Sequence, residues 1–128
     1  MFFTCHRDTR VPNMAKPITI LMAVAALTLL VAAAVHASVF GPIDPFEGAA
    51  PPEAILGVVL AAAAITALYS PSSRTFALGA TVLALVGTLY GLTVTVPRGA
   101  PGDIAYHVTL LALLAVTAVL LVRPRPHA

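Results

Sequence analysis

Residues 18–40 read ITILMAVAALTLLVAAAVHASVF, an apolar run without a single Asp, Glu, Lys or Arg. A helix rises about 1.5 Å per residue, so a run of this length can cross the roughly 30 Å hydrocarbon core of a bilayer. Three further apolar runs follow at residues 53–69, 75–96 and 103–122. Backbone groups in lipid must be hydrogen-bonded within their own segment, so each run is expected to be a helix.

The segments between these runs are short and rich in Gly, Pro or Ser, which favour turns. They cover residues 41–52, 70–74 and 97–102. The pattern predicts an all-α protein, a transmembrane four-helix bundle with antiparallel up-down topology, over residues 14–125. Residues 1–13 are expected to form a disordered N-terminal segment, and residues 126–128 a tail.

The composition excludes whole classes of protein. Hydrophobic residues make up 59% of the chain and charged residues 9%, whereas a soluble domain carries about 25% charged residues. A soluble fold is therefore excluded, and the expected partner is the lipid bilayer. The seven basic residues lie beside the apolar runs and not in a patch, so nucleic-acid binding is not expected. No GxSxG, HExxH, CxxC or P-loop motif occurs, and the chain is not expected to be an enzyme.

The basic residues predict the orientation. If the N-terminus is cytoplasmic, six of the seven lie on the inner side: Arg7, Arg10, Lys16, Arg74, Arg123 and Arg125. Only Arg98 then lies on the outer side. Cytoplasmic loops of membrane proteins carry the excess of Lys and Arg. Both termini are therefore expected in the cytoplasm, in a multi-pass protein of the plasma (bacterial inner) membrane.

Two alternatives concern the N-terminal region. Met14 precedes the first run directly and could be the true start, which would place residues 1–13 before the protein. The first run also resembles a signal peptide that ends in the small-x-small sequence Val35-His36-Ala37. Because this run is longer than the 7–15 apolar residues of a signal peptide, a retained span is favoured.

Small residues recur at helical spacing in the second and third runs. Such residues let membrane helices approach closely, so the following positions are expected to face neighbouring helices: Gly57, Ala61, Ala80, Ala84, Gly87 and Gly91. Gly87 and Gly91 form a GxxxG pair. The same stripes could serve a homo-oligomer or a larger membrane complex, and this alternative stays open.

Two histidines lie within the spans, and both fall near the outer ends of their helices. His36 is close to the end of the first run, and His107 lies one turn into the fourth. Asp103 precedes His107 by four residues and so shares its helix face. Three further polar residues are expected at the same depth and complete a polar outer-face layer: Glu53, Tyr90 and Tyr106.

Ionisable residues within membrane spans are costly and often functional. The leading interpretation is nevertheless structural: a non-enzymatic bundle without a cofactor, whose histidines hydrogen-bond to carboxylates or carbonyls. Three alternatives remain open. His36, His107 and Asp103 could bind a transition metal, the layer could serve a proton- or metal-coupled transporter, or the two histidines could ligate a b-type haem.

The layout resembles small four-span membrane proteins of unknown function of the actinobacterial, high-GC type. The resemblance covers most of residues 14–125. It rests on Val35-His36 at the end of the first run, on Arg74 in the tight inner loop, and on Gly91-Leu92-Thr93 before the last loop. It also includes Asp103-Ile104-Ala105-Tyr106-His107-Val108 at the start of the fourth run. The resemblance implies a four-span bundle and no particular activity.

Overall fold

The computed structural model describes residues 15–41 and 47–124, so the predicted N-terminal segment (1–13) and tail (126–128) lie outside the described residues. Within them the chain forms four α-helices: α1 (Ala15–His36), α2 (Ala50–Tyr69), α3 (Arg74–Thr95) and α4 (Pro101–Val122). Short 3-10 turns precede the last three helices: η1 (Glu47–Ala49), η2 (Pro71–Ser73) and η3 (Val96–Arg98). No described residue is in a strand. The prediction of an all-α four-helix bundle is confirmed.

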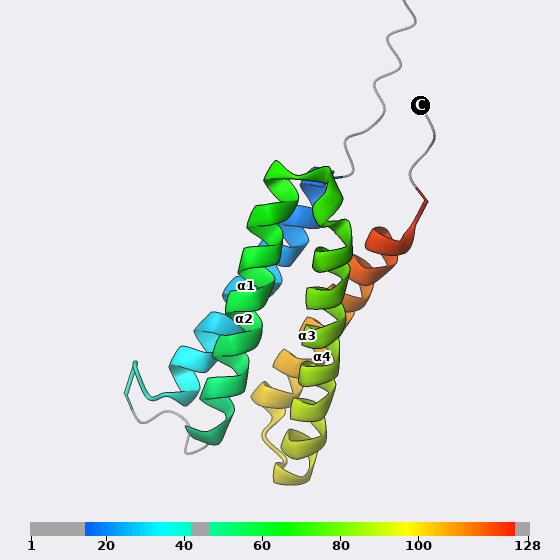
Figure 1. Cartoon of the computed structure of the whole chain (residues 1–128). Helices are drawn as coiled ribbons and strands as arrows, with labels where there is room; N and C mark the ends of the chain where they lie inside the picture. The colour runs from blue at the N-terminus through cyan, green and yellow to red at the C-terminus, as the bar shows by residue number, and fades with distance from the viewer. Residues whose placement is uncertain (1–14, 42–46, 125–128) are drawn as a thin grey trace, which may run out of the picture.

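The four helices pack around a common axis in chain order. Each contacts the helix that follows it, and α1 also contacts α4, which closes the ring. In Figure 1 the chain runs down α1, up α2, down α3 and up α4. We call the lower end in this view the polar end. There α1 and α3 end, and α2 and α4 begin.

Each helix is long and apolar enough to cross a membrane. α2 has 20 residues and the other three have 22 each, which corresponds to about 30–33 Å. The distribution of side chains also fits lipid on the outside. Large apolar side chains such as Ile20, Ile55, Val86 and Val116 are exposed, and a soluble monomer rarely exposes so much apolar surface. These features fit a multi-pass membrane protein.

The core is built mainly from small residues. Alanines from α1, α2 and α3 are buried in it: Ala25, Ala26, Ala63, Ala64, Ala77, Ala80 and Ala84. A few larger side chains fill the centre, among them Met22, Leu60 and Leu114. Thr81 and Thr117 are fully buried, and each hydroxyl donates to the carbonyl oxygen four residues earlier in its own helix. These two hydroxyls thus find partners without leaving their helix.

The small residues predicted at helix contacts lie there. A Cβ at position 57 would lie 2.8 Å from Leu30 Cγ and 3.2 Å from the carbonyl oxygen of Ala26, so Gly57 permits the close approach of α1 and α2. A Cβ at Gly87 would collide with Leu56 of α2. Ala80 and Ala84 are buried, and Ala61 is partly buried against the core.

The helix bounds differ from the predicted spans by a few residues. The largest difference is at α1, which ends at His36 and not at residue 40. Ser38 adopts a left-handed φ of 57°, and its N–H bonds to Val35 O while the N–H of Val39 reaches back to Ala34 O. This is the Schellman arrangement that ends helices. α2 and α4 begin earlier than predicted, at Ala50 and Pro101, because proline is well tolerated in a first turn.

At the opposite end of the bundle, Arg74 joins two helices. It is the first residue of α3. Its Nε donates to the carbonyl oxygen of Leu121 at 2.6 Å, and its Nη2 donates to the carbonyl oxygen of Arg123. The last carbonyls of a helix lack partners within the helix and carry its negative dipole end. Arg74 therefore caps α4 from a neighbouring helix.

Candidate functional site: a buried layer of histidines and carboxylates

The polar end brings together residues from all four helices. His36 is the last residue of α1, and Thr95 is the last residue of α3. Glu53 and Asp103 lie in the first turns of α2 and α4. A carboxylate is stabilised there by the positive end of the helix dipole. His107 follows Asp103 by one turn. We call these five residues the polar layer.

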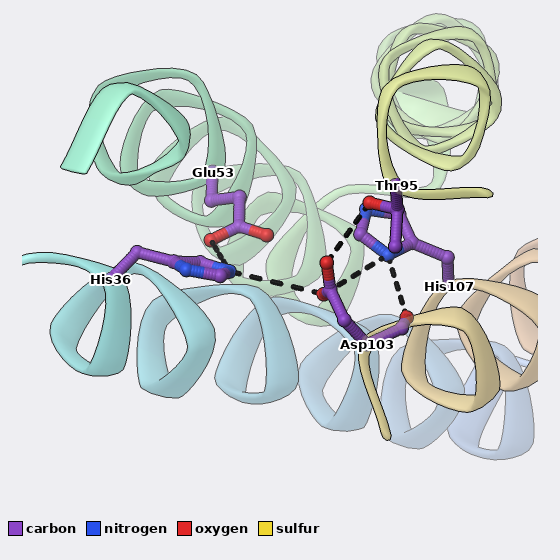
Figure 2. Close-up of polar contacts among 5 residues, drawn as sticks. All are labelled: His36, Glu53, Thr95, Asp103 and His107. Carbon is purple, nitrogen blue, oxygen red and sulfur yellow. Dashed lines mark hydrogen bonds and ion pairs between the residues drawn. The ribbon is translucent and has the colours of Figure 1, made fainter. Parts of the chain in front are cut away.

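Asp103 lies at the centre of the polar layer, between the two histidines (Figure 2). Its Oδ1 is 3.3 Å from Nδ1 of His107 and 4.0 Å from Nε2 of His36. Its Oδ2 accepts a hydrogen bond of 2.9 Å from the Thr95 hydroxyl. One carboxylate thus contacts side chains from α1, α3 and α4.

His36 connects Asp103 to Glu53 on the other side of the layer. Its Nε2 is 3.6 Å from Glu53 Oε2. Both residues are buried, with 4% and 7% of their surface exposed. The Tyr106 side chain interacts with Glu53 and lies in the field of Asp103. α1, α2 and α4 therefore meet through polar side chains as well as through apolar packing.

The imidazole of His107 is fixed from two sides. Its Nδ1 lies 2.8 Å from the carbonyl oxygen of Asp103. A carbonyl oxygen can only accept, so Nδ1 carries the proton in this geometry. A Cβ at Gly91 would collide with Nε2 of the ring. The ring thus occupies the space that a side chain at position 91 would need.

The structure brings most of the predicted site residues together. His36, His107, Asp103 and Glu53 lie within one connected set of contacts, and Tyr106 borders it. Tyr90 is not part of this set of contacts, and it is 71% exposed. Tyr90 lies at a similar depth but on the outer face of α3.

Thr95 supplies the contact from α3, and the sequence interpretation missed it. A usable signal was present. The stripe of small residues on α3 continues from Gly87 through Gly91 to position 95 at steps of four, which keeps these residues on one helix face. Thr95 therefore points inward, whereas Tyr90 is off that stripe.

A groove runs between α1 and α4 and ends at the polar layer. Its volume is about 490 Å³, and it is open to the outside of the bundle. Its apolar wall comes mainly from α1, and its polar end is formed by three residues. The lining residues are Leu27, Thr28, Val31, Ala32, Val35, His36, Asp103 and Tyr106.

The described residues can be compared with what a metal ion or a haem would need. Within residues 15–41 and 47–124, no three His, Cys, Asp or Glu side chains are grouped so that they could hold a metal ion. For haem, a histidine must present a ring nitrogen to an open space. Nδ1 of His107 faces Asp103, and Nε2 faces Gly91. His107 therefore does not fit an axial ligand in this conformation.

Comparison with protein-family models, with curated protein sequences and with solved structures gave no match to this chain.

Proposed function

We propose that this chain is a non-enzymatic, multi-pass protein of the cytoplasmic membrane in which the polar layer holds the four helices in register at one end. The observation that carries the proposal is the position of Asp103. It contacts His36 of α1, Thr95 of α3 and His107 of its own helix.

A structural role follows from the low dielectric of the bundle interior. Lipid tails are as apolar as leucine, so the hydrophobic effect does not hold helices together within the membrane. Contacts between polar side chains add to the close packing of small residues and favour one helix register. A shift of one helix by a turn would separate Asp103 from Thr95 or from His36.

The distances within the polar layer fit this role. The contacts of His36 with Glu53 and with Asp103 are 3.6 and 4.0 Å long. Electrostatic attraction, which stabilises the fold, acts at these distances.

Two threonines near the end of α3 provide a matched test. Thr95 is buried and donates to Asp103, whereas Thr93 is exposed and donates to the Tyr90 carbonyl of its own helix. Thr95→Val keeps the shape and removes the hydroxyl, so it should reduce the free energy of unfolding by about 1 kcal/mol. Thr93→Val should change it little.

The measurement is thermal or denaturant unfolding in a mild detergent. The structural role is supported if Thr95→Val is clearly less stable than Thr93→Val. Equal stability of the two variants would show that the polar layer does not hold the helices together, and the proposal would then be rejected.

A further inference from the structure

The groove between α1 and α4 has two chemically distinct parts. Along α1 it is apolar for about 14 Å, the rise over the nine steps from Leu27 to His36. Thr28 does not interrupt this apolar wall, because its hydroxyl is bonded to the carbonyl oxygen of Val24. At the end of the wall, His36, Asp103 and Tyr106 form a polar terminus. Such a surface suits a molecule with an apolar chain and one polar head.

The groove is accessible from the side of the bundle. Leu27 and Val31, which line it, are 64% and 50% exposed. In a protein whose helices cross the bilayer, these side chains face lipid. A ligand could therefore enter laterally from the membrane. The volume of about 490 Å³ falls within the range of roughly 300–1,000 Å³ that is typical of small-molecule sites.

The charge at the polar terminus selects the head group. The polar layer contains two carboxylates, Glu53 and Asp103, and its other members, His36, His107 and Thr95, carry no fixed charge. Asp103 is the more accessible of the two, since its side chain is 23% exposed against 10% for Glu53. The aromatic ring of Tyr106 lines the same end and can attract a cation through its π face. An anionic head group would be repelled by both carboxylates.

We propose that the α1–α4 groove binds a lipophilic ammonium compound, with its apolar chain along α1 and its cationic nitrogen at the Asp103 carboxylate. The occupant is a molecule with one chain, because the groove follows a single helix seam. The nitrogen lies beside the Asp103 carboxylate and the Tyr106 ring. This proposal concerns a ligand and does not depend on the role of the polar layer in stability.

Three probes with the same ten-carbon chain test the head group. Radiolabelled decylamine is cationic at neutral pH, decanol is neutral and decanoate is anionic. Binding to the full chain is measured in dodecyl maltoside, with protein-free micelles as the background. We expect saturable, protein-dependent binding of decylamine, with decanol and decanoate competing at least about tenfold more weakly. Equal or stronger competition by either probe, or no saturable binding, would overturn the proposal.

Two variants then locate the ligand. Asp103→Asn should weaken decylamine binding by at least about tenfold. Val31→Phe fills the groove from α1 and leaves the polar layer unchanged, so it should weaken binding even if Asp103→Asn does not fold. Val82→Phe is the matched control, because Val82 is exposed on α3 and does not line the groove. Wild-type affinity in Val31→Phe would exclude the groove as the site.

Discussion

At the scale of single residues, two glycines of α3 differ in what a side chain would meet. A Cβ at Gly91 would collide with the imidazole of His107, whereas a Cβ at Gly79 would have no atom within 4 Å. Alanine is preferred over glycine in a helix by about 1 kcal/mol. Gly79→Ala should therefore leave the protein as stable or make it slightly more stable. Gly91→Ala should displace His107, reduce its contact with Asp103 and lower the free energy of unfolding by about 1–3 kcal/mol.

Unfolding of both variants in detergent, measured side by side, checks this prediction. The double variant Gly91→Ala/His107→Ala serves as a second control, because it removes the ring that the new methyl group meets. If Gly91→Ala were as stable as Gly79→Ala, the imidazole would not occupy the space beside position 91.

The residues of the polar layer were only partly predictable from the sequence. His36, Asp103 and His107 could be placed together because charged and titratable side chains are rare in apolar runs, and their depth follows from the ends of the runs. Depth alone does not give the helix face, however. Tyr90 and Thr95 are at similar depth on α3, and only the direction of the Gly87–Gly91 stripe distinguishes the inward position from the lipid-facing one.

At the scale of helices, Arg74 caps α4. A prediction can distinguish the positive charge of this side chain from the geometry of its two hydrogen bonds. The guanidinium donates to Leu121 O through Nε and to Arg123 O through Nη2. Lysine keeps the positive charge but cannot reproduce this two-point contact. Arg74→Lys should therefore reduce the free energy of unfolding by about 1 kcal/mol or more without changing the orientation in the membrane. Arg123→Lys, which leaves the backbone carbonyl in place, should have little effect.

Comparison of the two lysine variants in detergent unfolding, together with a topology reporter, checks the cap. If both variants lost stability to the same extent, the loss would follow from replacing any arginine by lysine and not from the two contacts of Arg74. That result would contradict the cap. The sequence predicted Arg74 as an inner-side charge. It could not predict the cap, because residues 74 and 121 meet only once α3 and α4 are packed.

The residue at which α1 ends could not be predicted from sequence patterns either. Gly41 and the prolines after it indicated a turn, but the helix ends earlier, through a left-handed φ at Ser38. Serine rarely adopts this conformation. In the folded chain, His36 at this end contacts Glu53 and Asp103, and these contacts depend on two other helices.

At the scale of the whole molecule, the fold class was predictable because it follows from average properties of long segments. Four runs of apolar residues, separated by short turns, leave few alternatives to a helical bundle in a membrane. The structure adds how the bundle is packed, with alanines inside and branched apolar side chains outside. The sequence could not predict the groove, because its width depends on how α1 closes against α4.

The orientation of the bundle in the membrane remains a prediction, and it decides which compartment faces the polar layer. By their positions in the sequence, six of the seven basic residues are expected on the side of the termini, and this side is therefore expected in the cytoplasm. A fluorescent protein fused after Ala128 should fold and fluoresce, whereas alkaline phosphatase at the same position should be inactive. Phosphatase fused after Gly99, in the turn between α3 and α4, should be active, because that turn is at the opposite end. Phosphatase activity at Ala128 and fluorescence at Gly99 would reverse the orientation, and the polar layer would then face the cytoplasm.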